Sequence, residues 1–318
     1  MGNINSRGLF CMFPMADLRT RVGKLEMENP TMLASGILGQ TGEFLFRMVR
    51  EGGAGAVVTK SIGLEPREGH GSPCLLELEC GLLNAMGLPN PGIESFGGEI
   101  GIALKGGAPV IGSIFADTAE NFALLAKKME AAGASAVELN LSCPHATRYG
   151  LDVGSDPEKV AEIVRAVKSA VEIPVWAKLS PMVPDIAGIA LAAEEAGCDA
   201  VVAINTLKAM KVEVKVGKPV LRNRVGGLSG PAAKPVGVRA VYEIANRVKI
   251  PVIGVGGIST GEDALEYMMA GASAVQIGSG VHYRGTDVFS KVCAEVSAFL
   301  DARGWELSDV VGMAGGKA

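Results

Sequence analysis

A short phrase repeated along the chain is the feature that most constrains its fold. In this phrase an Ala/Gly turn leads through a short spacer into an apolar run, at 52–58, 132–137, 196–201 and 270–275. Glycine suits the left-handed residue that ends a helix, and the valines that follow suit a strand buried on both faces. Each copy therefore predicts a junction between a helix and the next strand.

A second phrase, proline followed by valine, opens apolar runs at 109–110, 174–175 and 251–252. Proline is tolerated at the first residue of a strand and is poor inside one, so these runs are also expected to be strands. The opening segment 30–35 completes a set of eight predicted strands. Helical patterns, several with Asp or Thr near the start as a cap, lie between strands at 118–132, 156–170, 185–196 and 261–270.

Strict alternation of strand and helix predicts a parallel sheet, and eight units predict closure into a (β/α)₈ TIM barrel of the α/β class. An open, doubly wound sheet is the structural alternative. A length of 318 residues fits a single barrel domain. We expect this domain to span residues 19–318, behind a flexible lead-in at 1–18.

The composition excludes several classes of protein. A formal net charge of −4 gives no basic face for nucleic acid. The six cysteines are scattered without a CxxC pair, so no zinc site, iron–sulfur cluster or other metal site is expected, and this usage fits a reducing cytosol. No apolar run approaches the roughly 20 residues of a membrane span. We therefore expect a cytoplasmic protein that binds neither nucleic acid nor a membrane.

The carboxyl ends of the predicted strands are polar or glycine-rich instead of apolar. These ends are 34–36, 59–61, 112–113, 140–143, 178–180, 205–206, 256–257 and 278–279. In a barrel all eight ends meet at one rim, where the loops that follow the strands build the active site. Packing of a core does not account for lysines and asparagines there, so the rim is the predicted site.

Glycines follow the last two predicted strands, at 254–257 and 278–280. Backbone N–H groups can approach a phosphate closely at this pair of positions, although glycine-rich strand ends are also ordinary tight turns. Lys60 and Lys178 each close an apolar strand. Surface lysines usually serve solubility, but two at strand ends are better explained as fixed positive charge for an anionic ligand or a reduced flavin ring.

Cys143 stands directly after a predicted strand, before Pro144, which forces an extended loop. A lone cysteine is more often a small buried hydrophobe, but its place on the rim favours a catalytic role. The loop at 84–92, between the second and third strands, is long enough to be a lid or binding segment. Asn84, Asn140 and Asn205 offer neutral donors and acceptors that match the amide and imide edges of a heterocycle.

These residues resemble the dihydroorotate dehydrogenases, and the class 1B catalytic subunit more closely than the quinone-linked class 2 enzyme. The matching motifs stand in order between residues 22 and 299. They are 33–36, 59–61, 84–92, 138–144, 178–181, 205–206, 226–232 and 256–264.

The resemblance implies a ligand set and a reaction. FMN is expected to be held by Ser35, Lys60, Ser61, Asn140, Lys178, Ile204, Gly230, Gly256, Gly257, Gly278 and Ser279. Dihydroorotate is expected to be held by Lys60, Asn84, Ala85, Met86, Gly87, Leu88, Asn140, Asn205 and Thr206. In the family mechanism a base removes the C5 proton of dihydroorotate while hydride passes from C6 to the flavin N5, which yields orotate for pyrimidine biosynthesis. The resemblance gives the base role to Cys143, with Lys60 as a second catalytic residue.

The resemblance also implies partners. In class 1B enzymes electrons leave FMN through a second subunit that carries FAD and an iron–sulfur cluster, and reach NAD, around a homodimeric core. Class 2 enzymes use serine in place of Cys143 and carry an N-terminal membrane element, and the chain has neither. His145 stands where asparagine is usual in the family, and the following loop at 146–154 is unusual.

Three other functions stay open. A phosphate-binding barrel similar to IMP dehydrogenase would use Cys143 to attack a nucleotide covalently. An enzyme similar to dihydropyrimidine dehydrogenase would act on a related substrate. Lys60 favours orotate over uracil, because it could pair with the carboxylate of orotate, which uracil lacks. A non-catalytic subunit that binds flavin would merely relay electrons.

Overall fold

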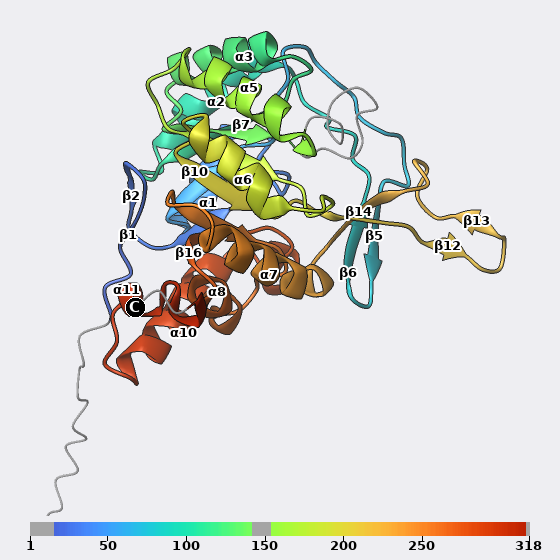
Figure 1. The fold of residues 1–318 in the computed structure, drawn as a ribbon. Helices are drawn as coiled ribbons and strands as arrows, with labels where there is room; N and C mark the ends of the chain where they lie inside the picture. Colours follow the sequence, from blue (N-terminus) through green and yellow to red (C-terminus); the bar gives the residue numbers. More distant parts are fainter. Residues whose placement is uncertain (1–15, 142–153, 316–318) are drawn as a thin grey trace, which may run out of the picture.

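Eight parallel strands close into a barrel in the computed structural model, which describes residues 16–141 and 154–315 (Figure 1). Neighbours around the barrel follow the chain order, and the last strand pairs with the first through Gln276 and Met32. The strands are β3 (Thr31–Leu33), β4 (Ala56–Val58), β7 (Val110–Ile114), β8 (Ala136–Asn140), β9 (Val175–Leu179), β10 (Ala200–Ala203), β15 (Val252–Val255) and β16 (Ala272–Ile277). The predicted TIM barrel is confirmed, and its closure excludes the open sheet.

Helices surround the barrel and follow the strands in sequence (Figure 1). They are α1 (Gly42–Arg50), α2 (Ile93–Leu104), α3 (Ala119–Ala131), α5 (Pro157–Lys168), α6 (Ile186–Glu195), α7 (Lys234–Ala245), α8 (Gly261–Met269) and α10 (Val288–Asp301). Thr118, Asp156, Asp185 and Thr260 accept hydrogen bonds from the first turns of α3, α5, α6 and α8. The predicted caps are therefore present, because each side chain satisfies a backbone N–H that lacks a partner within its helix.

The glycines of the repeated phrase have the backbone conformation that the sequence predicted. Gly133 and Gly197 follow α3 and α6 with φ values of 96° and 94°. A left-handed residue at this place turns the chain sharply, so that each helix leads directly into the next barrel strand.

Short antiparallel strands extend to one side of the barrel (Figure 1). Four of them form a sheet in the order β11 (Leu207–Ala209), β14 (Gly226–Ser229), β6 (Gly81–Asn84) and β5 (Leu75–Leu78). The hairpin β12 (Val212–Glu213) to β13 (Lys218–Pro219) projects farthest on this side. The remaining pair, β1 (Thr20–Val22) with β2 (Leu25–Met27), lies on the other side of the barrel in Figure 1. The remaining elements are α9 (Gly280–Arg284), α11 (Leu307–Val310) and the 3₁₀ turns η1 (Pro231–Ala233) and η2 (Met313–Gly315).

The long loop expected at 84–92 is found at 85–92, after an outer sheet that was not expected. Asn84 is the last residue of β6, which pairs with both β5 and β14. The connection between the second and third barrel strands therefore carries ordered β-structure before residues 85–92 lead into α2.

The amino-terminal half of the barrel lumen is filled by apolar side chains. Trp176, Met32 and Ile253 are completely buried there, and Val22 and Met27 of the β1–β2 hairpin belong to the same cluster. A plugged lumen leaves the carboxyl ends of the strands as the place where a cavity can open. Among the described residues, no helix is long and apolar enough to cross a membrane.

Candidate active site

A cavity of about 760 Å³ lies at the carboxyl ends of the barrel strands. This volume is within the range of roughly 300–1,000 Å³ that is usual for ligand sites. Its lining contains most of the predicted site residues, from seven of the eight strand ends and the outer sheet. They are Ser35, Lys60, Ser61, Asn84, Met86, Gly87, Leu88, Asn140, Lys178, Ile204, Asn205, Thr206, Gly256, Gly257, Gly278 and Ser279.

Three predicted residues stand apart from this lining. Ala85 is completely buried in a small cluster with Leu83 and Leu221, beneath the surface of the cavity. Gly230 lies next to the glycine loop, with its carbonyl oxygen close to Gly257. Cys143 lies outside the described residues, and so does His145, so the catalytic role of Cys143 stays a prediction.

A second hollow, of about 820 Å³, lies at the opposite end of the barrel. It is lined by the β1–β2 hairpin and by residues that precede β3, β4 and β7, such as Asn29, Gly55 and Pro109. None of the predicted site residues lines it. The cavity at the carboxyl ends is therefore the candidate active site.

A chain of hydrogen bonds joins side chains from five strand ends of the rim. The Ser61 hydroxyl lies 3.2 Å from that of Ser35 and 2.9 Å from that of Ser113. The Asn140 amide donates to Ser61 Oγ at 3.1 Å, and the Asn205 amide donates to Asn140 Oδ1 at 3.4 Å. These contacts fix which way each amide faces, so the cavity presents a defined pattern of donors and acceptors.

A buried polar triangle of Glu138, Lys178 and Gln276 spans the lumen at the floor of the cavity. Lys178 Nζ donates to Glu138 Oε1 at 3.3 Å and to Gln276 Oε1 at 3.1 Å. Gln276 Nε2 donates to the other Glu138 oxygen at 2.6 Å. Lys178 is 6% exposed and its two partners are completely buried, so the ion pair is held inside the barrel.

Lys178 was predicted from the sequence, whereas Glu138 and Gln276 had no predicted role. Each is a polar residue between two apolar neighbours in a buried strand, Glu138 in β8 and Gln276 in β16. Since a charged or amide side chain is rarely buried without a partner, that pattern could have identified them.

The outer sheet supplies one wall of the cavity. Asn84 donates to the Gly227 carbonyl at 3.3 Å, which ties β6 to β14. A Cβ atom at Gly227 would lie 2.1 Å from Thr206 Oγ1, so only glycine lets β14 approach Thr206 this closely. Leu82, Met86 and Leu228 make the same wall apolar.

The glycine loop after β15 is held from below by Tyr267 of α8. Tyr267 is completely buried, and its hydroxyl donates to the Gly256 carbonyl at 2.8 Å. Burial raises the pKa of Tyr267, so the hydroxyl keeps its proton and remains a donor. Gly257 has φ +70°, and a Cβ atom there would lie 2.7 Å from the Gly230 carbonyl oxygen.

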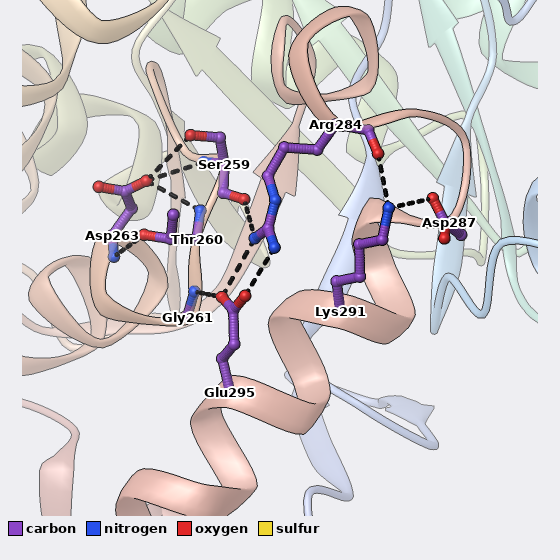
Figure 2. Close-up of polar contacts among 8 residues, drawn as sticks. All are labelled: Ser259, Thr260, Gly261, Asp263, Arg284, Asp287, Lys291 and Glu295. Atoms are coloured by element: carbon purple, nitrogen blue, oxygen red, sulfur yellow. Dashed lines mark hydrogen bonds and ion pairs between the residues drawn. The ribbon is translucent and has the colours of Figure 1, made fainter.

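A polar network fastens this loop and α9 to α10 (Figure 2). Arg284, at the end of α9, donates to the Ser259 carbonyl at 2.8 Å and to both oxygens of Glu295. Hydrogen bonding to Arg284 lowers the pKa of the Glu295 carboxyl, which therefore stays charged. Asp263 accepts from the backbone N–H groups of Ser259 and Thr260, both at 2.9 Å. The two glycine segments of the cavity thus rest on a shared, rigid support.

The described cysteines lie away from the cavity. Burial raises the pKa of the Cys198 thiol to about 12 and that of Cys293 to about 11. Cys198 donates to the carbonyls of Val175 and Ala200, near the amino ends of β9 and β10. This burial fits a structural role for Cys198. Among the described residues, no cluster of three or more His, Cys, Asp or Glu could hold a metal ion.

Comparison with known proteins gives the family. The family model of dihydroorotate dehydrogenase matches residues 17–300. "Dihydroorotate dehydrogenase B (NAD(+)), catalytic subunit" of Thermoplasma acidophilum is 54% identical over 301 residues, which are 94% of this chain and 99% of that protein. Proteins of the same name from Methanocella arvoryzae and Methanocaldococcus jannaschii are 53% and 50% identical, over 92% and 93% of this chain and 96% and 98% of their own lengths. The chain belongs to the dihydroorotate dehydrogenase family.

Proposed function

We propose that this chain is the catalytic subunit of an NAD-linked dihydroorotate dehydrogenase, which oxidises dihydroorotate to orotate in pyrimidine biosynthesis. The observation that carries the proposal is the cavity itself. It combines a buried cation, a chain of fixed amides and a glycine loop at one rim, in a chain whose relatives carry that enzyme's name.

The residues present fit FMN as the cofactor. Gly256, Gly257 and Gly278 line the cavity and carry no side chain, so a phosphate can approach the backbone of both glycine segments. Lys178 supplies a buried positive charge at the cavity floor, where a flavin ring needs a partner for its N1 side. We assign cofactor binding to Ser35, Lys60, Ser61, Asn140, Lys178, Ile204, Gly230, Gly256, Gly257, Gly278 and Ser279. When bound, FMN supplies the acceptor for a hydride, which the side chains of this protein lack.

The amides and Lys60 recognise the substrate. Asn140 and Asn205 are oriented by their mutual hydrogen bond, and Asn205 Oδ1 also accepts from the Thr206 backbone N–H at 2.7 Å. Such neutral groups select the hydrogen-bond pattern of the pyrimidine ring. The Lys60 ammonium pairs with the substrate carboxylate, and its 7% exposure makes that charge pair strong. We assign the rest of the substrate site to Asn84 of the outer sheet and to Met86, Gly87 and Leu88 of the loop that follows, with Ala85 packed behind them.

Cys143 removes the proton from C5 of dihydroorotate in this proposal. It stands three residues after Asn140, which lines the cavity as the last residue of β8. A thiolate is the active form of such a base, and cationic neighbours favour it. Lys60, which follows β4 and lines the cavity, is the cation that favours the thiolate form of Cys143 in this proposal.

Electrons leave the site through other subunits. The relatives are named catalytic subunits, which supports a partner, and we assign to it the FAD and iron–sulfur cluster of a class 1B complex. A second copy of this chain forms the core of the assembly. The projecting hairpin supports such a contact because Val214 and Val216 at its tip are 89% and 64% exposed, and exposed apolar clusters mark interaction surfaces.

The test is anaerobic reduction of bound FMN by dihydroorotate, measured by stopped flow with the wild-type chain, Cys143→Ser and Cys80→Ser. Cys80 is an exposed cysteine of the outer sheet and serves as the matched control. We expect Cys143→Ser to keep its FMN and to react about 10²–10⁴-fold more slowly, the usual contribution of a positioned base. An unchanged rate in Cys143→Ser, or an equal loss in Cys80→Ser, would refute the assignment of Cys143.

A further inference from the structure

We propose that Glu138 is a positioning residue that holds Lys178 in one orientation and lowers the redox potential of the site to suit an NAD-linked acceptor. This inference rests on the proposed binding of FMN in the cavity. It concerns the polar triangle of Glu138, Lys178 and Gln276. Glu138 and Gln276, the two partners of Lys178, have no role in the proposed function.

The triangle is a closed structure that crosses the barrel. In the strand order, three strands separate β8 from β16 on either side, so Glu138 and Gln276 come from opposite walls. Their 2.6 Å hydrogen bond therefore spans the lumen. Lys178 of β9 donates to both of them, and all three side chains have at least two contacts within the set.

This arrangement leaves Lys178 with one defined direction for a ligand. An ammonium group has three N–H donors, and two of them are used by Glu138 and Gln276. Lys178 also lines the cavity, so its third N–H group can donate to a ligand bound there. An unrestrained lysine side chain would lose conformational entropy on binding a ligand, because several rotatable bonds would become fixed. The triangle already fixes these bonds before the ligand binds.

Charge is the second effect of Glu138. The carboxylate and the ammonium together contribute no net charge to the cavity floor, whereas Lys178 alone would contribute one positive charge. The reduced cofactor carries more negative charge than the oxidised one, so a lone cation would strongly favour reduction. The completely buried carboxylate of Glu138 opposes this preference for the reduced cofactor, because it lies close to Lys178 and is little screened by solvent. A lower potential would suit the transfer of electrons to a weak oxidant such as NAD.

The test compares the two-electron midpoint potential of bound FMN in the wild-type chain, Glu138→Gln and Gln276→Met. Glu138→Gln removes the charge and keeps the shape, while Gln276→Met removes hydrogen bonds from the same triangle and keeps the charge. At an effective dielectric constant of about 20, unit charges roughly 10 Å apart change an equilibrium more than tenfold. We expect Glu138→Gln to raise the preference for the reduced cofactor by at least about tenfold, or about 30 mV for two electrons. Gln276→Met should shift the potential by much less.

The outcomes separate the two proposals. A wild-type chain that binds no FMN would overturn the proposed function, before any variant is considered. A wild-type chain that binds FMN, with a potential that Glu138→Gln leaves unchanged or lowers, would overturn the role of Glu138. If Glu138→Gln does not fold, Glu138→Met gives the same measurement, because it also removes the carboxylate at a similar volume and must raise the potential. An unchanged or lowered potential in that variant would also overturn the inference.

Discussion

Gly257 offers a test of the site geometry with a single methyl group. Its φ of +70° costs an alanine about 1–2 kcal/mol. The added Cβ would also lie 2.7 Å from the Gly230 carbonyl oxygen and 2.9 Å from Lys234 Cβ. The nearest atom belongs to the backbone, so relief requires a loop to move, at a cost of about 1–3 kcal/mol. We therefore expect Gly257→Ala to lower the free energy of unfolding by about 2–5 kcal/mol.

Gly107 is the matched control for this substitution. It has a similar φ of +87°, but a Cβ atom there has no neighbour within 4 Å. Gly107→Ala should therefore lose only the conformational part, about 1–2 kcal/mol. The effect of alanine on the unfolded chain is the same at both positions and cancels in the comparison.

Two measurements on both variants decide the matter. Urea unfolding of the chain without cofactor gives the stability difference, and titration with FMN gives the affinity. We expect Gly257→Ala to bind FMN about tenfold more weakly, since the cost of about 1–3 kcal/mol for displacement of its loop brackets the roughly 1.4 kcal/mol that corresponds to that factor. Equal stability losses in the two variants, or full FMN affinity in Gly257→Ala, would refute the close approach of Gly230 as the reason for glycine here.

Three further outcomes are expected. Tyr267→Phe removes the hydroxyl that donates to the Gly256 carbonyl, so it should lower the free energy of unfolding by about 1–2 kcal/mol and weaken FMN binding. An unaltered melting curve and an unaltered FMN affinity would contradict this expectation. Burial raises the pKa of the Cys198 thiol to about 12, so iodoacetamide at pH 8 should modify Cys80 and spare Cys198 until the chain unfolds, as mass spectrometry would show. Val214→Asp should convert the proposed dimer to monomers in light scattering, and a wild-type chain that is already monomeric would exclude that dimer.

The barrel was predictable because its signals are local. The glycine after α3 and the one after α6 each lie within a few residues of the strand that they introduce, as Gly133 precedes β8 and Gly197 precedes β10. Caps such as Thr260 are also read within one turn of their helix. Eight such units leave the parallel, right-handed barrel as the consistent arrangement.

The outer sheet could not be predicted in the same way. β6 pairs with β14, so that Asn84 lies opposite Gly227, more than a hundred residues later. The strands have four residues or fewer, and two of the residues in β14 are glycines. No alternation of apolar and polar residues can develop over such a length, and the pairing depends on contacts that only the closed barrel brings together.

Only part of the candidate site could be predicted, because some of its contacts also depend on the closed barrel. The rim residues followed from strand ends, and the cavity unites residues as distant in sequence as Ser35 and Ser279. Glu138 and Gln276 were missed because their partnership crosses the lumen between opposite strands. Spacing along the sequence carries no information about which side chains meet across a barrel.

The most direct test of the proposed function is anaerobic titration of the purified, FMN-loaded chain with dihydroorotate, followed by flavin absorbance. The proposal assigns the substrate carboxylate to Lys60 and the imide edge to Asn140 and Asn205, all of which line the cavity. We therefore expect dihydroorotate to bleach the flavin at stoichiometric amounts, and dihydrouracil, which lacks the carboxylate, to leave it oxidised. Bleaching by dihydrouracil without bleaching by dihydroorotate would contradict the proposed substrate and the role of Lys60.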